Sequence, residues 1–85
     1  MIAKDLIAKI RKFKGPVYIE THNFNDVFYV QAVKGDLINM ITEAFSADTE
    51  TGFEIDNNGY LGKDFDSHDW SFWLTLSGFY SRLRL

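Results

Sequence analysis

The sequence predicts an α+β fold in which an antiparallel sheet of about four to five strands carries two helices on one of its faces. Two stretches predict the helices, one near the N-terminus and one in mid-chain, because both space their apolar residues for a single helical face. The sheet is predicted by short segments, rich in β-branched and aromatic residues, that flank turn-forming residues. The expected order is α-β-β-α-β-β-β, and a chain of 85 residues has the size of one domain, here 1–85.

The first helix is expected over residues 2–13. Gly15-Pro16 ends it, because glycine accepts the left-handed closing position and proline cannot continue a helix. The apolar residues that share one face of this helix are Ile2, Leu6, Ile10 and Phe13.

Two strands follow, over residues 17–21 and 27–33, where β-branched and aromatic residues dominate. The segment between them, 22–26, is polar and turn-prone, which predicts an antiparallel hairpin. Phe24 at its tip is an apolar residue in a polar loop.

The second helix is expected from Asp36 to about Ser46. Asp36 is the expected N-cap, since its carboxylate can accept hydrogen bonds from the free amides of the first turn. A second hairpin is then expected over 53–56 and 60–63. Asn58-Gly59 between these strands predicts a type I′ turn, which needs positive φ at both central residues.

Residues 70–77 are expected to form the last strand, because apolar residues occupy every second position and mostly polar residues lie between them. The apolar positions are Trp70, Phe72, Leu74 and Leu76, and those between them are Ser71, Trp73, Thr75 and Ser77. A helix is the alternative here. The residues that fit its spacing are Trp73, Leu76 and Tyr80. Residues 79–85 fit either structure.

The composition excludes several classes of protein. The chain has no cysteine, so neither disulfides nor a thiolate zinc site can brace it. It has neither the apolar run of about 20 residues that a membrane span requires nor a secretory signal, so we expect a soluble protein of the cytoplasm. Aromatic residues make up 16% of the chain, more than a small core demands, which leaves some of them for recognition.

Charge is unevenly distributed along the chain, whose net charge is −3. Residues 1–14 and the C-terminal end are basic, whereas 15–69 is acidic. The basic ends can pack beside the acidic middle and neutralise it. The alternatives are an acidic face that engages a basic partner and one that mimics nucleic acid. Direct binding of nucleic acid is not expected of a chain with a pI of 5.2. The acidic residues expected to bind a partner are Glu54, Asp56, Asp64, Asp66 and Asp69.

Aromatic side chains on the sheet face opposite the helices would contribute a second part of such an interface, because rings give large contact areas at low entropic cost. The expected aromatic contacts are Tyr18, Phe24, Tyr29 and Trp73. A homodimer through the sheet face or an edge strand is a related hypothesis.

No catalytic constellation, metal site or cofactor site is predicted. His22 and Glu20 alternate onto one strand face and can pair, but no activated nucleophile accompanies them. The segment from Glu54 resembles the start of a calcium loop, yet Phe65 stands at the twelfth position, where a bidentate glutamate is required.

Two segments, Gly15-Pro16-Val17-Tyr18-Ile19 and Phe28-Tyr29-Val30-Gln31-Ala32-Val33-Lys34-Gly35-Asp36-Leu37-Ile38, give the first half of the chain a resemblance to small accessory proteins of bacteriophages and prophages. The resemblance implies a mobile-element protein expressed in a bacterial cytoplasm. Small phage proteins of this size often bind and inhibit a host protein.

Together these observations predict a non-enzymatic binding protein that engages a host protein. Inhibition of a bacterial defence system such as CRISPR-Cas is one role within that class. The alternative is a homodimeric protein that sequesters a small molecule or nucleotide between aromatic rings.

Overall fold

Three helices and four strands make up the part of the chain that the computed structural model describes, residues 1–23, 25–63 and 70–84. The α+β prediction is confirmed, but these residues form three helices where two were expected. In chain order the elements are α1 (Ala3–Lys12), β1 (Val17–Asn23), β2 (Asp26–Ala32), α2 (Lys34–Ala44), β3 (Phe53–Ile55), β4 (Tyr60–Lys63) and α3 (Trp70–Arg84).

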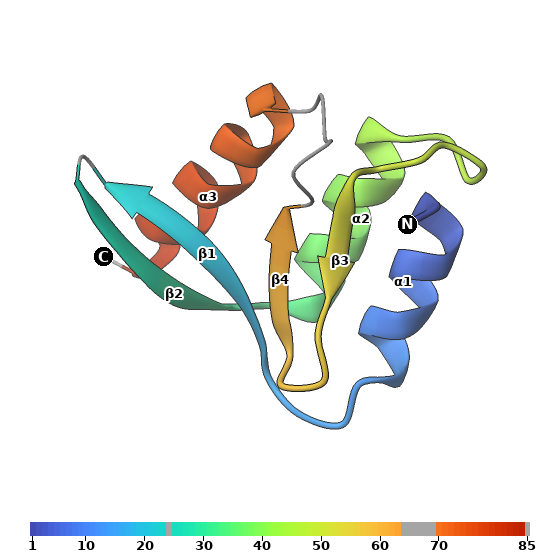
Figure 1. Ribbon diagram of the computed structural model, residues 1–85, viewed down its shortest axis with the longest axis horizontal. Coiled ribbons are helices and arrows are strands. Elements are labelled where there is room, and N and C mark those ends of the chain that lie inside the picture. Colours follow the sequence, from blue (N-terminus) through green and yellow to red (C-terminus); the bar gives the residue numbers. More distant parts are fainter. Residues whose placement is uncertain (24, 64–69, 85) are drawn as a thin grey trace.

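The sheet is mixed, with the strand order β2-β1-β4-β3. Both expected hairpins form, because β1 pairs antiparallel with β2 and β3 pairs antiparallel with β4. The two hairpins join through a parallel pairing that sets Tyr18 beside Tyr60 and Ile19 beside Leu61. The expectation of a purely antiparallel sheet was therefore wrong. After β2 the chain passes through α2 behind the sheet and enters β3 at the far edge, and β4 then returns in the direction of β1 (Figure 1).

The hydrophobic core lies between the sheet and the helices. Figure 1 looks onto the opposite sheet face, with α2 and α3 behind the sheet and α1 beside β3. Alternate residues of β1 point into the core, so Val17, Ile19 and Thr21 are fully buried. The helices contribute the buried residues Leu6, Ile10, Leu37, Ile41, Trp73, Leu76 and Tyr80.

The expected strand over 70–77 is instead the first half of α3. Trp73, Leu76 and Tyr80 recur at helical spacing and are each at most 1% exposed, whereas Leu74 is 60% exposed. The alternating pattern was misleading because short apolar segments fit both periods, and only the surface available for burial decides between them. The side chain of Trp73 packs against Phe53, with ring centroids 5.4 Å apart.

Two local predictions also need correction. α2 begins at Lys34 with Val33 in the capping position and no side-chain cap, so Asp36 lies within the first turn. The β3–β4 connection is a three-residue turn in place of a type I′ turn, since the Gly59 amide donates to the Asp56 carbonyl and the Asp56 amide to the Tyr60 carbonyl. Gly59 takes the left-handed position with φ of 86°.

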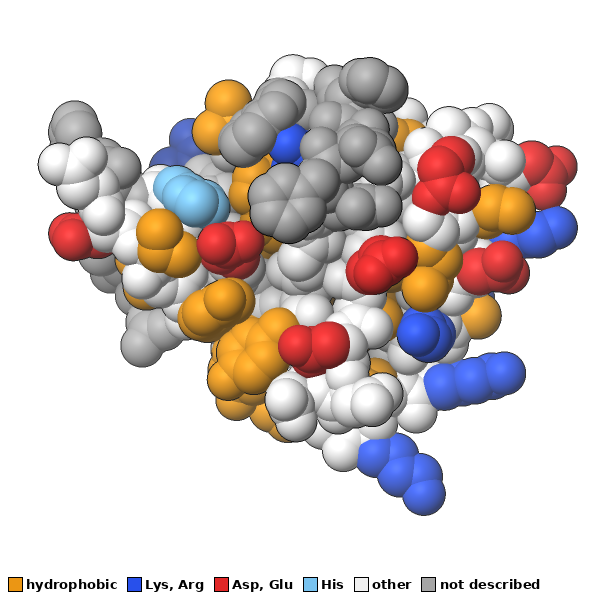
Figure 2. All heavy atoms as spheres, in the orientation of Figure 1, with side chains coloured by type: hydrophobic (Ala, Val, Ile, Leu, Met, Phe, Trp, Pro, Cys, Tyr) orange, Lys and Arg blue, Asp and Glu red, His pale blue; other side chains and the backbone are white. Residues whose placement is uncertain are grey.

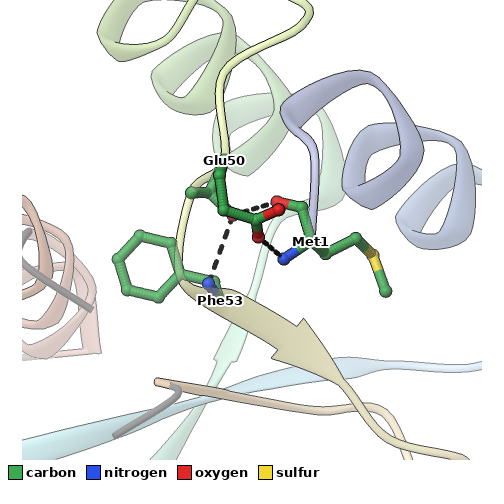
Figure 3. A network of polar contacts seen from close by, with 4 residues as sticks. Met1, Glu50 and Phe53 are labelled. Carbon is green, nitrogen blue, oxygen red and sulfur yellow. Dashed lines mark hydrogen bonds and ion pairs between the residues drawn. The ribbon is translucent and has the colours of Figure 1, made fainter. Parts of the chain in front are cut away.

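The first residue of the chain is attached to the segment that leads into β3 (Figure 3). The terminal ammonium of Met1 contacts the Glu50 carboxylate, and the Met1 carbonyl accepts hydrogen bonds from both the amide (3.0 Å) and the hydroxyl (2.8 Å) of Thr51. The same hydroxyl accepts the Phe53 amide at 3.2 Å. Thr51, which is fully buried, thus joins the start of α1 to the start of β3.

Candidate functional site

The sheet face opposite the helices, which we call the open face, carries an unusual set of side chains. On β1 the residues that alternate with the buried ones, Tyr18, Glu20 and His22, project onto it. Figure 2 shows this face, where hydrophobic and tyrosine side chains (orange) gather near the centre with carboxylates (red) around them. Basic side chains (blue) collect on the side of α1.

The sheet register places polar residues of the open face on neighbouring strands. Glu20 on β1 stands opposite Tyr29 on β2, and Glu54 on β3 stands opposite Gly62 on β4. The parallel pairing that joins the two hairpins ends at Ile19 and Leu61, one residue before Glu20 and Gly62. Glu20 and Glu54 thus come from different hairpins, and both line one hollow together with Gly62.

Three tyrosine rings form a cluster on the open face. The ring of Tyr60 lies 5.4 Å from that of Tyr18, its neighbour across the β1–β4 pairing. It also meets the ring of Tyr29 edge-on at 4.7 Å, although β2 and β4 are separated by β1. The rings of Tyr29 and Tyr60 thus reach toward each other over β1, in an edge-to-face arrangement that stabilises aromatic pairs.

The carboxylates of Glu20 and Glu54 and the rings of Tyr29 and Tyr60 line a hollow of about 350 Å³, which we call the acidic hollow. Gly62 lies at its floor, and the space above it is open, because a Cβ built there would meet nothing within 4 Å. The lining residues with side chains that can contact a ligand are Glu20, Tyr29, Glu54, Asp56, Tyr60 and Lys63.

The carboxylates around the hollow are not equivalent. Glu20 contacts His22, with 3.4 Å between Oε1 and Nε2, as the alternation along β1 predicts. Asp56 is occupied structurally, because its Oδ1 accepts the amides of Asn58 at 2.8 Å and Tyr60 at 2.9 Å and so builds the β3–β4 turn. Glu54 is exposed at the centre of a three-residue strand. Glu20 and Glu54 are therefore the carboxylates best placed to act on a ligand.

This arrangement suits a cation. Carboxylates form charge-assisted hydrogen bonds with guanidinium and ammonium groups, and tyrosine faces attract the same groups through their quadrupole. A hollow of this size accepts an arginine or lysine side chain, and it lies at the lower end of the range of about 300–1,000 Å³ that small-molecule pockets occupy.

The structure brings some of the predicted partner-binding residues together. Tyr18, Tyr29 and Glu54 lie on the open face, and Asp56 borders it. The prediction that Trp73 offers an exposed ring was wrong, since it is 1% exposed within the core. The remaining predicted residues, Phe24, Asp64, Asp66 and Asp69, lie outside the described residues.

The predicted contacts did not include Glu20, Gly62 or Lys63, which also line the acidic hollow. The alternation along β1 already placed Glu20 on the face of Tyr18, so a sequence signal for it existed. The approach of Gly62 and Lys63 to Glu20 depends on the β1–β4 pairing, which links segments far apart in the chain and leaves no local signal.

Other types of site find less support in the described part of the chain. No three His, Asp or Glu residues among those described are grouped to hold a metal ion. The N-terminal and C-terminal basic segments do not merge, because α1 and the last turn of α3 lie on opposite sides of the molecule (Figure 1). None of the described helices has the length and apolar character needed to cross a membrane.

In comparisons with known proteins, no family model, curated protein or solved structure matches this chain.

Proposed function

We propose that this protein is a non-enzymatic binding protein whose open face receives a basic segment of a partner protein. An arginine or lysine side chain of the partner would enter the acidic hollow, between Glu20 and Glu54 and against the rings of Tyr29 and Tyr60. The hollow that Glu20 and Glu54 line together with the rings of Tyr29 and Tyr60 is the observation that carries this proposal.

The charge around the hollow favours this function over the sequestration of a nucleotide. A phosphate group bound in the hollow would share it with the carboxylates of Glu20, Glu54 and Asp56 and with the single ammonium group of Lys63, so the net negative charge of the lining opposes it. A cationic ligand would gain energy from the same net charge. The alternative that retains most support is therefore a small cationic molecule held in the same hollow.

The partner we propose is a host protein in a bacterial cytoplasm. A defence complex that binds nucleic acid, such as a CRISPR-Cas assembly, presents basic grooves of the kind that an acidic, aromatic face would occupy. This step rests on the resemblance to phage and prophage accessory proteins and on the chemistry of the open face.

Gly62→Val is the sharpest test of the hollow. The substitution adds a side chain at its floor, removes no charge, and favours the strand conformation. A second variant, Glu20→Gln with Glu54→Gln, removes the charge and keeps the shape. Glu43→Gln is the matched control, because it removes one carboxylate from an exposed position on α2.

The measurement is a titration of the isotope-labelled protein with a short arginine-rich peptide, followed by NMR, and a parallel capture of partners from bacterial lysate at two salt concentrations. We expect the peptide to shift the amide signals of Tyr29, Tyr60 and Gly62, and both hollow variants to bind at least about tenfold more weakly, a loss of about 1.4 kcal/mol. Glu43→Gln should bind like the parent protein. Equal binding by parent, Gly62→Val and the double glutamine variant would refute the proposal.

A further inference from the structure

The outer edge of β2 is a sheet edge beside the acidic hollow, to which this strand contributes Tyr29. β2 stands at the end of the strand order and runs for seven residues, Asp26–Ala32. The other end of the sheet is β3, which has only three residues and lies beside α1. The sheet therefore has one long edge.

The register identifies the main-chain groups that face outward from this edge. The Tyr18 amide donates to the Gly59 carbonyl at 2.8 Å, on the side of β4, so Tyr18 does not exchange hydrogen bonds with its β2 neighbour Gln31. Bonded and non-bonded pairs alternate in an antiparallel ladder. The amides and carbonyls of Gln31, Tyr29 and Val27, which follow one another at every second position, therefore point away from β1, where the described residues include no further strand.

The residues of β2 itself carry few of the usual protections against pairing. Natural edge strands carry lysine, proline, a bulge or an inward charge. β2 has neither lysine nor proline, its register with β1 is unbroken, and Asp26 at its first position is its only charged residue.

Apolar side chains beside the edge are also left uncovered. Val27 is 53% exposed, and Val33, directly after β2, is 57% exposed. Leu83 on α3, likewise 57% exposed, lines a depression at this edge together with Val33 and Gln31. A partner strand paired with β2 would bury these side chains.

We infer that β2 pairs antiparallel with β2 of a second copy of this chain. An antiparallel pairing of identical strands is self-complementary and closes as a two-fold dimer. In the register that uses the whole strand, Val27 stands opposite Gln31 of the copy, and Asp26 stands opposite Ala32 of the copy. The only charge of the strand thus faces an alanine and not its own counterpart.

The dimer would have one continuous sheet of eight strands, built from the four described strands of each copy. Its two-fold axis is perpendicular to the sheet, so both open faces point to the same side. If the proposed function holds, the dimer presents two acidic hollows to one partner, and the pairing itself stands whether or not that function is correct.

Charge substitutions at the paired positions test the inference. V27K/Q31K and V27E/Q31E place like charges opposite each other in each homodimer, and opposite charges when the two variants are mixed. N39K/T42K is the control, with the same added charge on the exposed side of α2. Sedimentation velocity over a range of concentrations gives the mass of each species, and circular dichroism confirms that each variant is folded.

We expect the parent protein and N39K/T42K to be dimers, each charged edge variant alone to have half that mass, and their equimolar mixture to regain the dimer mass. A monomeric parent protein at all concentrations, dimeric edge variants, or a mixture that stays monomeric would each overturn the inference.

The absence of cysteine permits an independent check of the register. V27C/Q31C should form an intermolecular disulfide on mild oxidation, because opposed residues in a ladder lie about 5.5 Å apart between Cα atoms. V27C alone should not, because the two copies of residue 27 would lie roughly 13 Å apart along the strands. Efficient cross-linking of the single variant would contradict the register.

Discussion

A Cβ atom placed on Gly59 would lie 2.5 Å from the carbonyl oxygen of Pro16. This close approach occurs where the β3–β4 turn meets the start of β1, and the Gly59 carbonyl there accepts the Tyr18 amide at 2.8 Å. The pairing of the two hairpins thus begins at a residue that must have no side chain.

Gly59→Ala is therefore expected to destabilise the protein by about 2–4 kcal/mol, from left-handed backbone strain and from the clash with Pro16. Urea unfolding followed by circular dichroism measures the change. Gly78→Ala is the control, because a Cβ at that position in α3 meets nothing within 4 Å, and it should stabilise by about 0.5–1 kcal/mol. Equal effects of the two substitutions would contradict the described approach of the turn to β1.

Thr51→Val should cost about 1–2 kcal/mol of stability, since it removes the hydroxyl that joins the Met1 carbonyl to the Phe53 amide in a fully buried position. Glu50→Gln, one residue earlier, should cost less than about 0.5 kcal/mol, because its ion pair with the terminal ammonium is largely exposed. Thermal and urea unfolding of both variants give the comparison. A larger loss of stability from Glu50→Gln than from Thr51→Val would contradict this ranking of the two contacts.

Trp73 should behave as a core residue and not as a surface ring. In a Trp70→Phe variant it is the only tryptophan, and we expect its emission to be blue-shifted relative to the denatured protein and poorly quenched by iodide. Trp73→Ala should cost about 3–5 kcal/mol, enough to unfold a marginally stable domain. Strong iodide quenching in the folded Trp70→Phe variant would restore the surface role that the alternating pattern suggested.

Tyr80 should make stability depend on pH in the alkaline range. Burial raises the pKa of its phenol above the ordinary value of about 10, and the negative charge of Asp36 adds to this effect. The folded state thus holds a proton that the unfolded state releases above about pH 10, so stability falls there by at most about 1.4 kcal/mol per pH unit for this group.

Tyr80→Phe separates this effect from other alkaline titrations. At neutral pH the variant should be about 1 kcal/mol less stable, because the Val33 carbonyl loses the hydroxyl that donates to it at 3.1 Å. Above pH 10 the difference between parent and variant should shrink, as the parent alone loses the contribution of the buried phenol. Unfolding free energies measured across this range test the point, and a difference that stays constant would refute it.

Local signals in the sequence were sufficient for most of the elements. The apolar spacing of Leu6 and Ile10 and the glycine-proline pair that follows predicted α1, and alternation along β1 placed Tyr18 and Glu20 on one face. These signals act within a few residues, through backbone conformation and the direction of neighbouring side chains, and so they are readable from the chain itself.

Tertiary structure alone decided the rest. Trp73 fits a strand and a helix equally well by sequence, and it entered the core because the inner side of β1 and β2 required a covering helix. The acidic hollow exists because β4 pairs with β1, which brings Glu54 and Gly62 of the second hairpin to the same hollow as Glu20 of the first. That pairing joins residues distant in the sequence, and it is selected by the simultaneous burial of the apolar faces of all these elements, a condition that no local pattern encodes.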